Sequence, residues 1–258
     1  MNIEDNDKLI LLTNDDGLYA GGIKTLIRIM EDFGKLVVIS ATESRSAMSQ
    51  ALTVKQPLRV KLLEEDDRKR IYACSGTPAD GIKLAVSQLL ERKPDLVVSG
   101  INHGSNASAS ILYSGTMAAA LEGCLYDITS VGFSLNSYSS SADFSGCEEY
   151  IRKICTMLLR EPLPPGICLN VNFPALPAAA IKGMIVARQA SGNWQEEFEK
   201  RKDPAGKTYY WLTGNFVNRE PEASDTDDWA IQNGYVSVVP VTTDMTAYGF
   251  METLKSKF

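Results

Sequence analysis

Two adjacent carboxylates, Asp15 and Asp16, follow a short apolar run at residues 9–13 and precede Gly17. Two like charges at the tip of a buried strand are costly unless a positive charge lies between them. The pair therefore predicts a metal site. The alternative, which the residues alone leave open, is that the pair caps and acidifies the first turn of the helix expected after it.

Two further oxygen-bearing side chains follow later apolar runs, Ser46 after residues 36–39 and Asn102 after residues 95–99. Hydroxyl, amide and carboxylate oxygens are hard ligands, which suit magnesium, manganese or calcium better than zinc. Taken singly, Ser46 is typical of a polar loop, and Asn102 is typical of a turn beside Gly104. They gain weight as metal ligands because both are expected at the same edge of the sheet as the aspartates.

Ser114, Gly115 and Thr116 begin a predicted helix. The first N–H groups of a helix lack backbone acceptors and carry partial positive charge, so they can hold a phosphate group. We expect these amides, together with Asn102 and Asn106, to bind phosphate oxygens. Plain N-capping by Ser114 is the alternative that stays open.

His103 is the single histidine of the chain, so any serine or cysteine triad would have to use it. Beside Asn102 it could serve as a general acid, or it could be an ordinary loop histidine near the site. The sequence contains no G-x-G-x-x-G, G-x-x-x-x-G-K-[ST] or G-x-S-x-G pattern. The missing glycine fingerprint disfavours a redox enzyme that binds a dinucleotide.

The elements that must position these residues alternate between strand-like and helix-like patterns. Residues 23–30 have the spacing of an amphipathic helix, and Thr77, Pro78 and Asp80 have the types expected at a helix start. Helices are expected to begin near residues 23, 78, 114 and 144, the second running to about Arg92. Strands are expected at 9–13, 36–39, 52–60, 70–74, 95–99, 128–133, 167–172, 181–187 and 235–241, with a charged turn at 64–69.

This alternation predicts an α/β fold with a mostly parallel sheet joined by right-handed crossovers. Ligands of such sheets bind beyond the carboxyl ends of the strands, where the strand order reverses. The polar clusters at 14–17, 44–46 and 99–106 all follow strand ends. We expect a single domain, which consists of a core at 8–187 with strand 235–241, an aromatic arm at 188–228 and a C-terminal segment at 242–258.

Composition disfavours several classes of function. The net charge of −6 is the opposite of what a binder of nucleic-acid polymers normally carries. The five cysteines are odd in number and form no C-x-x-C pair, which argues against a zinc site and a disulfide framework. Residues 1–10 are acidic and polar rather than a signal peptide, and no apolar run reaches the roughly 18–20 residues of a membrane span. We therefore expect a cytoplasmic protein without a membrane partner.

Six stretches of the chain resemble the SurE family, the survival-protein-E nucleotidases, in the same order and over almost the whole length. Any one stretch is weak evidence, but six together are specific. They are LLTNDDGLYAGGIKTL at 11–26, GTPAD at 76–80, SGINHGSN at 99–106, YSGTMAAALEG at 113–123, RQASGNW at 188–194 and DTDDWAIQNGYVSVVPV at 225–241.

The resemblance implies a Rossmann-like, three-layer α/β core and a C-terminal extension used in dimer or tetramer assembly. It implies a 5′- and 3′-nucleotidase that removes phosphate from nucleoside monophosphates, sometimes with exopolyphosphatase activity. By position, the family's metal ligands correspond to Asp15, Asp16, Ser46 and Asn102. The chain departs from the family at Ala41-Thr42, where the family usually has Ala-Pro, and this departure bears on the placement of Ser46.

Together these observations predict one divalent cation per subunit, magnesium or manganese with calcium possible, facing the phosphate of a nucleoside monophosphate. A metal-activated water could attack the phosphorus, or Asp15 could attack it directly and form an aspartyl-phosphate. The sequence does not separate these routes. A second hypothesis is a non-catalytic stress protein that binds a nucleotide or metal through the same motifs.

Overall fold

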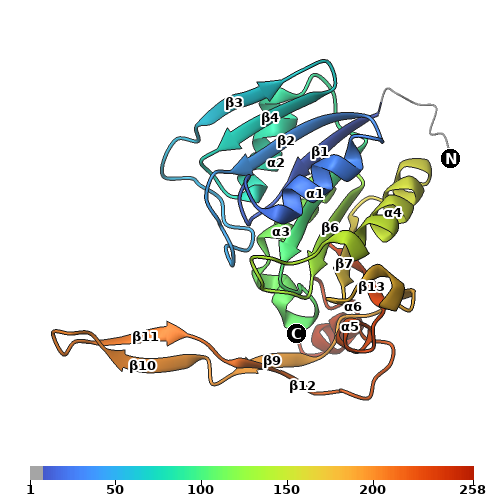
Figure 1. Ribbon diagram of the computed structural model, residues 1–258. Helices are drawn as coiled ribbons and strands as arrows, with labels where there is room; N and C mark the ends of the chain where they lie inside the picture. The colour runs from blue at the N-terminus through green and yellow to red at the C-terminus, as the bar shows by residue number, and fades with distance from the viewer. Residues whose placement is uncertain (1–7) are drawn as a thin grey trace.

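A nine-stranded, mostly parallel sheet forms the centre of the protein in the computed structural model, which describes residues 8–258 (Figure 1). Its strand order is β3-β4-β2-β1-β5-β6-β7-β13-β8, and only the pairs β3–β4 and β7–β13 are antiparallel. The predicted α/β class is therefore confirmed. The strands are β1 (Leu9–Thr13), β2 (Lys35–Ala41), β3 (Val60–Glu65), β4 (Lys69–Cys74), β5 (Leu96–His103), β6 (Ser130–Leu135), β7 (Ile167–Phe173), β8 (Met184–Val186) and β13 (Val236–Thr242).

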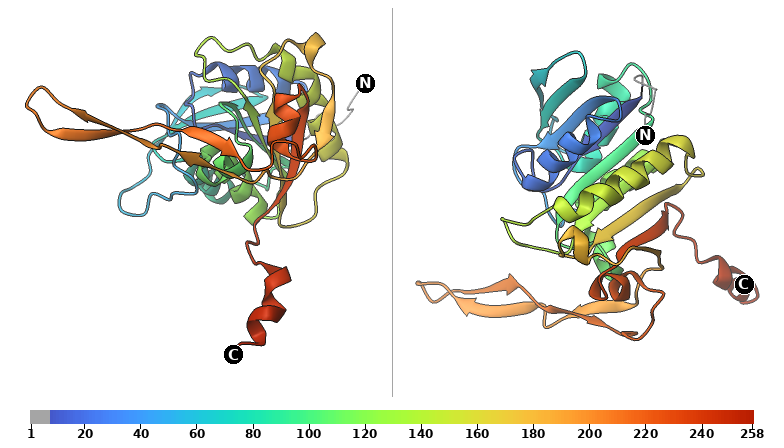
Figure 2. Two further views of the ribbon diagram at one scale, coloured as in Figure 1. Left: turned by 90° about the horizontal axis from the view of Figure 1, so that it is seen from below. Right: turned by 45° about the vertical axis from the view of Figure 1, so that its right-hand side comes forward.

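Helices cover both faces of this sheet, because its central strands are apolar on both faces. Side chains such as Leu12 pack with α1 and α4 in one buried cluster, whereas side chains such as Leu11 pack with α2 and α3 in another. This gives the predicted three layers (Figure 2). The helices are α1 (Gly21–Met30), α2 (Pro78–Leu84) with a continuing π-turn η1 (Ala85–Leu89), α3 (Gly115–Leu125), α4 (Glu148–Arg160), α5 (Asp227–Gln232) and α6 (Tyr248–Lys255). Short 3-10 turns are η2 (Ser108–Tyr113), η3 (Ser145–Cys147) and η4 (Ala178–Ala180).

Strand order reverses at β1, which pairs with β2 on one side and with β5 on the other, both in parallel register. The chain passes from β1 to β2 and later returns to β5, so two crossovers leave this point in opposite directions. The carboxyl ends of β1 and β5 are therefore the place where an open parallel sheet offers a binding site. Asp15, Asp16 and Asn102, three of the residues predicted to carry the chemistry, lie there.

One predicted strand was wrong. Residues 51–59 form no strand, and the β3–β4 hairpin begins only at Val60. The segment is held instead by side chains at the start of α2. Thr53 donates from its backbone N–H and its hydroxyl to the Asp80 carboxylate, and the Thr77 hydroxyl donates to the carbonyl of Ala51. The predicted helix start at Thr77, Pro78 and Asp80 is confirmed, and the structure shows that Thr77 and Asp80 form a capping box. The helix ends at Leu89, earlier than predicted.

The second half of the chain carries two projecting segments. A pair of short two-stranded ribbons forms an arm that extends well away from the sheet (Figures 1 and 2). Helix α6 also projects, and none of its residues is buried (Figure 2). The ribbon strands are β9 (Gly192–Gln195), β10 (Phe198–Lys202), β11 (Thr208–Leu212) and β12 (Asn215–Asn218).

The sequence also predicts that the chain has neither a membrane span nor a signal peptide. Within residues 8–258, no helix has both the length and the apolar character needed to cross a membrane. Residues 1–7, where the sequence predicts no signal peptide, lie outside the described residues.

Candidate functional site

A tight turn after β1 places the two aspartates at the sheet edge. Asn14 is buried and fixes this turn, because its side-chain amide donates to the carbonyl of Gly17 and its side-chain oxygen accepts from the Ser40 hydroxyl. Gly17 has a φ of +95°, a conformation that favours glycine, and a Cβ there would lie 3.3 Å from the backbone of Glu43. The turn after β1 and the loop after β2 therefore pack directly together.

Asp15 is buried, with 3% of its surface exposed, and it faces the first turn of α3. Its Oδ1 accepts a 2.6 Å hydrogen bond from the Thr116 hydroxyl, and Gly115 lies so close that a Cβ there would be 2.9 Å from Oδ2. Burial raises the pKa of Asp15 to about 6; the Thr116 hydrogen bond opposes this rise and the charge of Asp16 adds to it. Within residues 8–258, no lysine or arginine pairs with Asp15, so its charge is not balanced by a side chain.

Asp16 turns the other way and contacts the end of β5. Its Oδ2 accepts two hydrogen bonds from one residue, at 2.9 Å from the backbone N–H of His103 and at 3.0 Å from the ring Nδ1. His103 thereby joins the turn after β1 to β5. The sequence placed His103 near the site but contained no signal for this partner.

Asn102 lies within β5 rather than after it, because the strand continues to His103 past an irregular register between Ser99 and Asn102. Its side chain is buried, and its amide nitrogen donates to the carbonyl of Gly104 at 2.7 Å. That bond orients the side chain and leaves the amide oxygen for another partner. Asn102 is thus brought to the carboxyl end of β5 next to the residue that binds Asp16.

Ser46 is the predicted ligand whose side chain the structure does not bring to the others. The loop itself is attached to the site, because the backbone N–H of Arg45 donates to the carbonyl of Asp15 at 2.7 Å. The Ser46 side chain, however, is exposed and its hydroxyl pairs with that of Ser44 at 2.8 Å. A proline before this loop would restrict its backbone, and this chain has Thr42 there instead. The absence of proline is consistent with a Ser46 hydroxyl that does not point toward the aspartates.

The start of α3 has the features expected of a phosphate site. Ser114 is its N-cap, and the Ser114 hydroxyl accepts from the N–H of Met117 at 3.0 Å. The N–H groups of Gly115 and Thr116, the first two of the helix, have no acceptor within the helix. N-capping, the alternative that the sequence left open, is thus what the Ser114 side chain does. Of the two neighbouring amides, that of Thr116 also interacts with the Asp15 carboxylate and lowers its pKa.

Asn106, also predicted to bind phosphate, lies within a buried network of asparagines. Its amide nitrogen donates to the Ser134 hydroxyl at 2.8 Å, and its backbone N–H donates to Asn172 at 2.7 Å. Asn170 donates in turn to the carbonyl of Asn106. The sequence did not predict this network, because its members lie far apart in the chain, on the loop after β5, on β6 and on β7.

The donors present suit a hard cation. The described residues contain no cluster of three or more histidine, cysteine, aspartate or glutamate side chains that could hold a metal. The candidate set is instead two adjacent carboxylates and one amide oxygen, with a serine hydroxyl on a neighbouring loop. All of these are oxygen ligands, and the buried, unbalanced charge of Asp15 is a position that a cation would stabilise.

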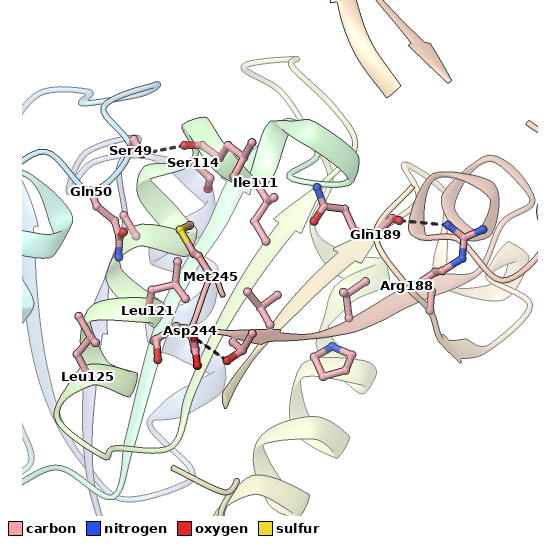
Figure 3. A pocket seen from close by; sticks show the side chains of 18 residues that line it. Ser49, Gln50, Ile111, Ser114, Leu121, Leu125, Arg188, Gln189, Asp244 and Met245 are labelled. Atoms are coloured by element: carbon pink, nitrogen blue, oxygen red, sulfur yellow. Dashed lines mark hydrogen bonds between the residues drawn. The ribbon is translucent and has the colours of Figure 1, made fainter. Parts of the chain in front are cut away.

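A separate cavity of about 520 Å³ lies beside α3 (Figure 3). Leu121 and Leu125 of α3, Val239 of β13 and Met245 of the C-terminal segment contribute to its lining. Of the residues predicted to carry chemistry, only Ser114 lines it. This apolar cavity is therefore distinct from the carboxylate site.

Comparisons with known proteins identify the family of this chain. The family model described as "Survival protein SurE" matches residues 10–196. A 5′-nucleotidase SurE of Flavobacterium johnsoniae is 49% identical over 98% of both chains, and one of Bacteroides fragilis is 48% identical over 98% of this chain and 99% of its own. The crystal structure of a SurE protein from Aquifex aeolicus superposes with a TM-score of 0.83 at 36% identity, covering 96% of this chain and 99% of that one. This chain belongs to the SurE family.

Proposed function

We propose that this chain is a metal-dependent 5′-nucleotidase that hydrolyses nucleoside monophosphates to nucleoside and phosphate. The observation that carries the proposal is the meeting of Asp15, Asp16 and the start of α3 at the point where the strand order reverses. Relatives that match nearly the whole chain are named 5′-nucleotidase SurE. Activity on 3′-monophosphates and short polyphosphate belongs to the same proposal through the family resemblance.

Asp15, Asp16 and Asn102 hold a divalent cation, magnesium or manganese in the first place. Ser46 is the fourth ligand of the proposal, and its hydroxyl would exchange its bond to Ser44 for the cation. A cation held there supplies charge neutralisation at the phosphoryl oxygens and a more acidic water. Thr116 holds Asp15 in place through its hydroxyl, which supports the carboxylate as a ligand.

The substrate phosphate binds between that cation site and the first turn of α3. The N–H groups of Gly115 and Thr116 lie at the helix start, where the helix dipole favours an anion. The phosphate would share the Thr116 N–H with the Asp15 carboxylate. Ser114 and Asn106 complete the binding surface from the cap and from the buried asparagine network. This arrangement neutralises charge as it develops in the in-line transition state, without any need for a basic side chain.

Asp15 serves as a ligand rather than as the nucleophile in this proposal. Its side chain is buried, one oxygen is bonded to Thr116 and the other lies against Gly115. An attacking carboxylate would need open space in line with the phosphorus. Water is the smaller and more accessible nucleophile here.

The test is phosphate release from AMP, GMP and CMP by protein stripped with EDTA and then supplied with magnesium, manganese or calcium. We expect no release in chelator and restored release with at least one metal. Release of phosphate in full in the presence of EDTA would contradict the metal site. Nucleotide binding without release under every metal would instead support the non-catalytic binding protein.

The proposal includes self-association and a cytoplasmic location. The arm exposes Tyr210 and Leu212 to 60% and 68%, and α6 exposes Phe250 to 52%, which is apolar surface typical of an interface. A homodimer or homotetramer would cover it. All five cysteines are buried free thiols, as expected in a reducing compartment.

A further inference from the structure

The contact between Asp16 and His103 is more elaborate than a surface ion pair. Two donors from the same residue, the backbone N–H and the ring Nδ1, converge on the single oxygen Oδ2 at 2.9 Å and 3.0 Å. A carboxylate oxygen accepts both bonds when Nδ1 is the ring nitrogen that carries the hydrogen, and this is the tautomer that satisfies the contact. The other oxygen, Oδ1, has no hydrogen-bond partner within residues 8–258.

The imidazole ring is itself immobilised. Phe144 packs against it edge-to-face, with 5.1 Å between the ring centroids and an angle of 88° between the planes. Phe144 is buried and also packs beside Gly21, at the start of α1. The histidine ring is thus held between Phe144 and Asp16 and cannot change rotamer without breaking one of these contacts.

We infer that His103 is a positioning residue for the cation site, which fixes the Asp16 carboxylate through Oδ2 and leaves Oδ1 as the oxygen for the metal. The inference rests on the proposed function, because it assigns Asp16 to the metal. A carboxylate on an open turn samples several orientations, and each must be lost when a cation binds. Hydrogen bonds that orient a ligand remove this cost in advance, and loss of such a partner typically lowers metal affinity about 10–100-fold.

The position of the donor gives a discriminating pair of variants. In His103→Asn the side-chain amide nitrogen can occupy the place of Nδ1, whereas in His103→Gln the amide is one bond further out, near the place of Nε2. His103→Leu removes the donor but keeps apolar contact with Phe144. All three variants keep the backbone N–H bond to Asp16, so the comparison isolates the ring.

The experiment measures the dissociation constant of Mn²⁺ by isothermal titration calorimetry on protein stripped with EDTA, with melting in EDTA as a second readout. We expect His103→Gln and His103→Leu to bind Mn²⁺ about tenfold or more weakly, and His103→Asn to remain close to wild type. Hydrolysis of AMP by His103→Leu should recover as Mn²⁺ is raised, since the defect lies in affinity. Melting in EDTA should be similar for all three.

Equal Mn²⁺ affinity for His103→Asn and His103→Gln, or an unchanged affinity for His103→Leu, would overturn the inference while leaving the proposed nucleotidase intact. Weaker binding by all three variants in step with their melting points would show a structural role instead and would also overturn it. Failure of the wild-type protein to bind Mn²⁺ would overturn the proposed metal site, and this inference with it.

Discussion

Asp15 combines burial with a neighbouring like charge, and this combination is unfavourable for a carboxylate without a cation. Burial and Asp16 raise its pKa from 3.8 to about 6, so between these values the folded protein holds a proton that the unfolded chain has lost. The metal-free protein therefore loses stability as the pH rises from 3.8 through about 6. At neutral pH the full penalty is present and amounts to at most about 3 kcal/mol.

Asp15→Asn tests this cost and the metal role together. The amide keeps an oxygen that can accept from Thr116 but loses the charge, so we expect hydrolysis of AMP to fall by roughly 10³-fold or more. In EDTA at neutral pH the variant should melt at or above the wild-type temperature. Turnover of AMP at the wild-type rate by this variant would exclude Asp15 from the site. The control is the exposed substitution Asp67→Asn, which should change neither the hydrolysis of AMP nor the melting temperature.

Gly115→Ala tests the close approach of α3 to the carboxylate. The added Cβ would lie 2.8 Å from the Cβ of Asp15, so the side chain or the helix must shift. We expect kcat/KM to fall by about 10²-fold, because displacement of catalytic groups by about 1 Å costs that much. The control is Gly249→Ala on α6, where the new methyl group meets nothing within 4 Å; a similar loss there would contradict the explanation.

At the scale of elements, the cap of α2 replaces strand pairing as the anchor of residues 51–59. Thr77 accepts from the N–H of Asp80 and donates to Ala51, so one side chain connects the helix start and the irregular segment. The sequence identified the cap from local residue types alone. The sequence pattern wrongly predicted a strand at residues 52–60. Periodicity does not show that the backbone of this segment pairs with side chains of the α2 cap instead of with a neighbouring strand.

Thr77→Ala should lower the free energy of unfolding by about 1 kcal/mol, the usual effect of a lost N-cap, and somewhat more because the bond to Ala51 is also lost. For a chain of this size that corresponds to a decrease of roughly 2–4 °C in the melting temperature. The check is thermal melting of this variant beside Ser87→Ala, an exposed site in η1, the turn that continues α2. An unchanged melting point would show that the cap is redundant.

At the scale of the whole molecule, the arm is a projecting feature whose apolar side chains a single subunit leaves exposed. Tyr210 and Leu212 share one face of the β10–β11 ribbon, opposite Lys200 and Phe198 in the register. A two-stranded ribbon that projects from the domain has little stability of its own unless its apolar face is covered. Another copy of the chain is the partner that the proposed self-association provides.

The double substitution Tyr210→Glu with Leu212→Glu should therefore reduce the mass in solution toward the 28.2 kDa of one chain. Charges buried at an interface cost far more than exposed ones, so we expect dissociation rather than a slight weakening. Light scattering coupled to gel filtration measures the mass. The control is Ser87→Glu, a single exposed substitution far along the chain from the arm, which should leave the mass in solution unaltered. An unchanged mass for the arm variant would exclude this face as the interface.

The sequence alone determined the α/β class, the central strands and the identity of the family. These follow from local patterns, namely the buried run before Asp15, the cap at Thr77 and six motifs in order. It also predicted the edge of the sheet at which the polar clusters meet, because parallel strands place their carboxyl ends together.

Only the tertiary structure decided which atoms touch there. Asp15 is 101 residues from the Thr116 hydroxyl that it binds, and Asp16 is 87 residues from His103. Such pairings depend on the register of neighbouring strands and on the packing of α3, which no local pattern encodes. The Ser46 side chain shows the converse: its loop reaches the site, but its hydroxyl faces Ser44, since an exposed side chain is not fixed by the core.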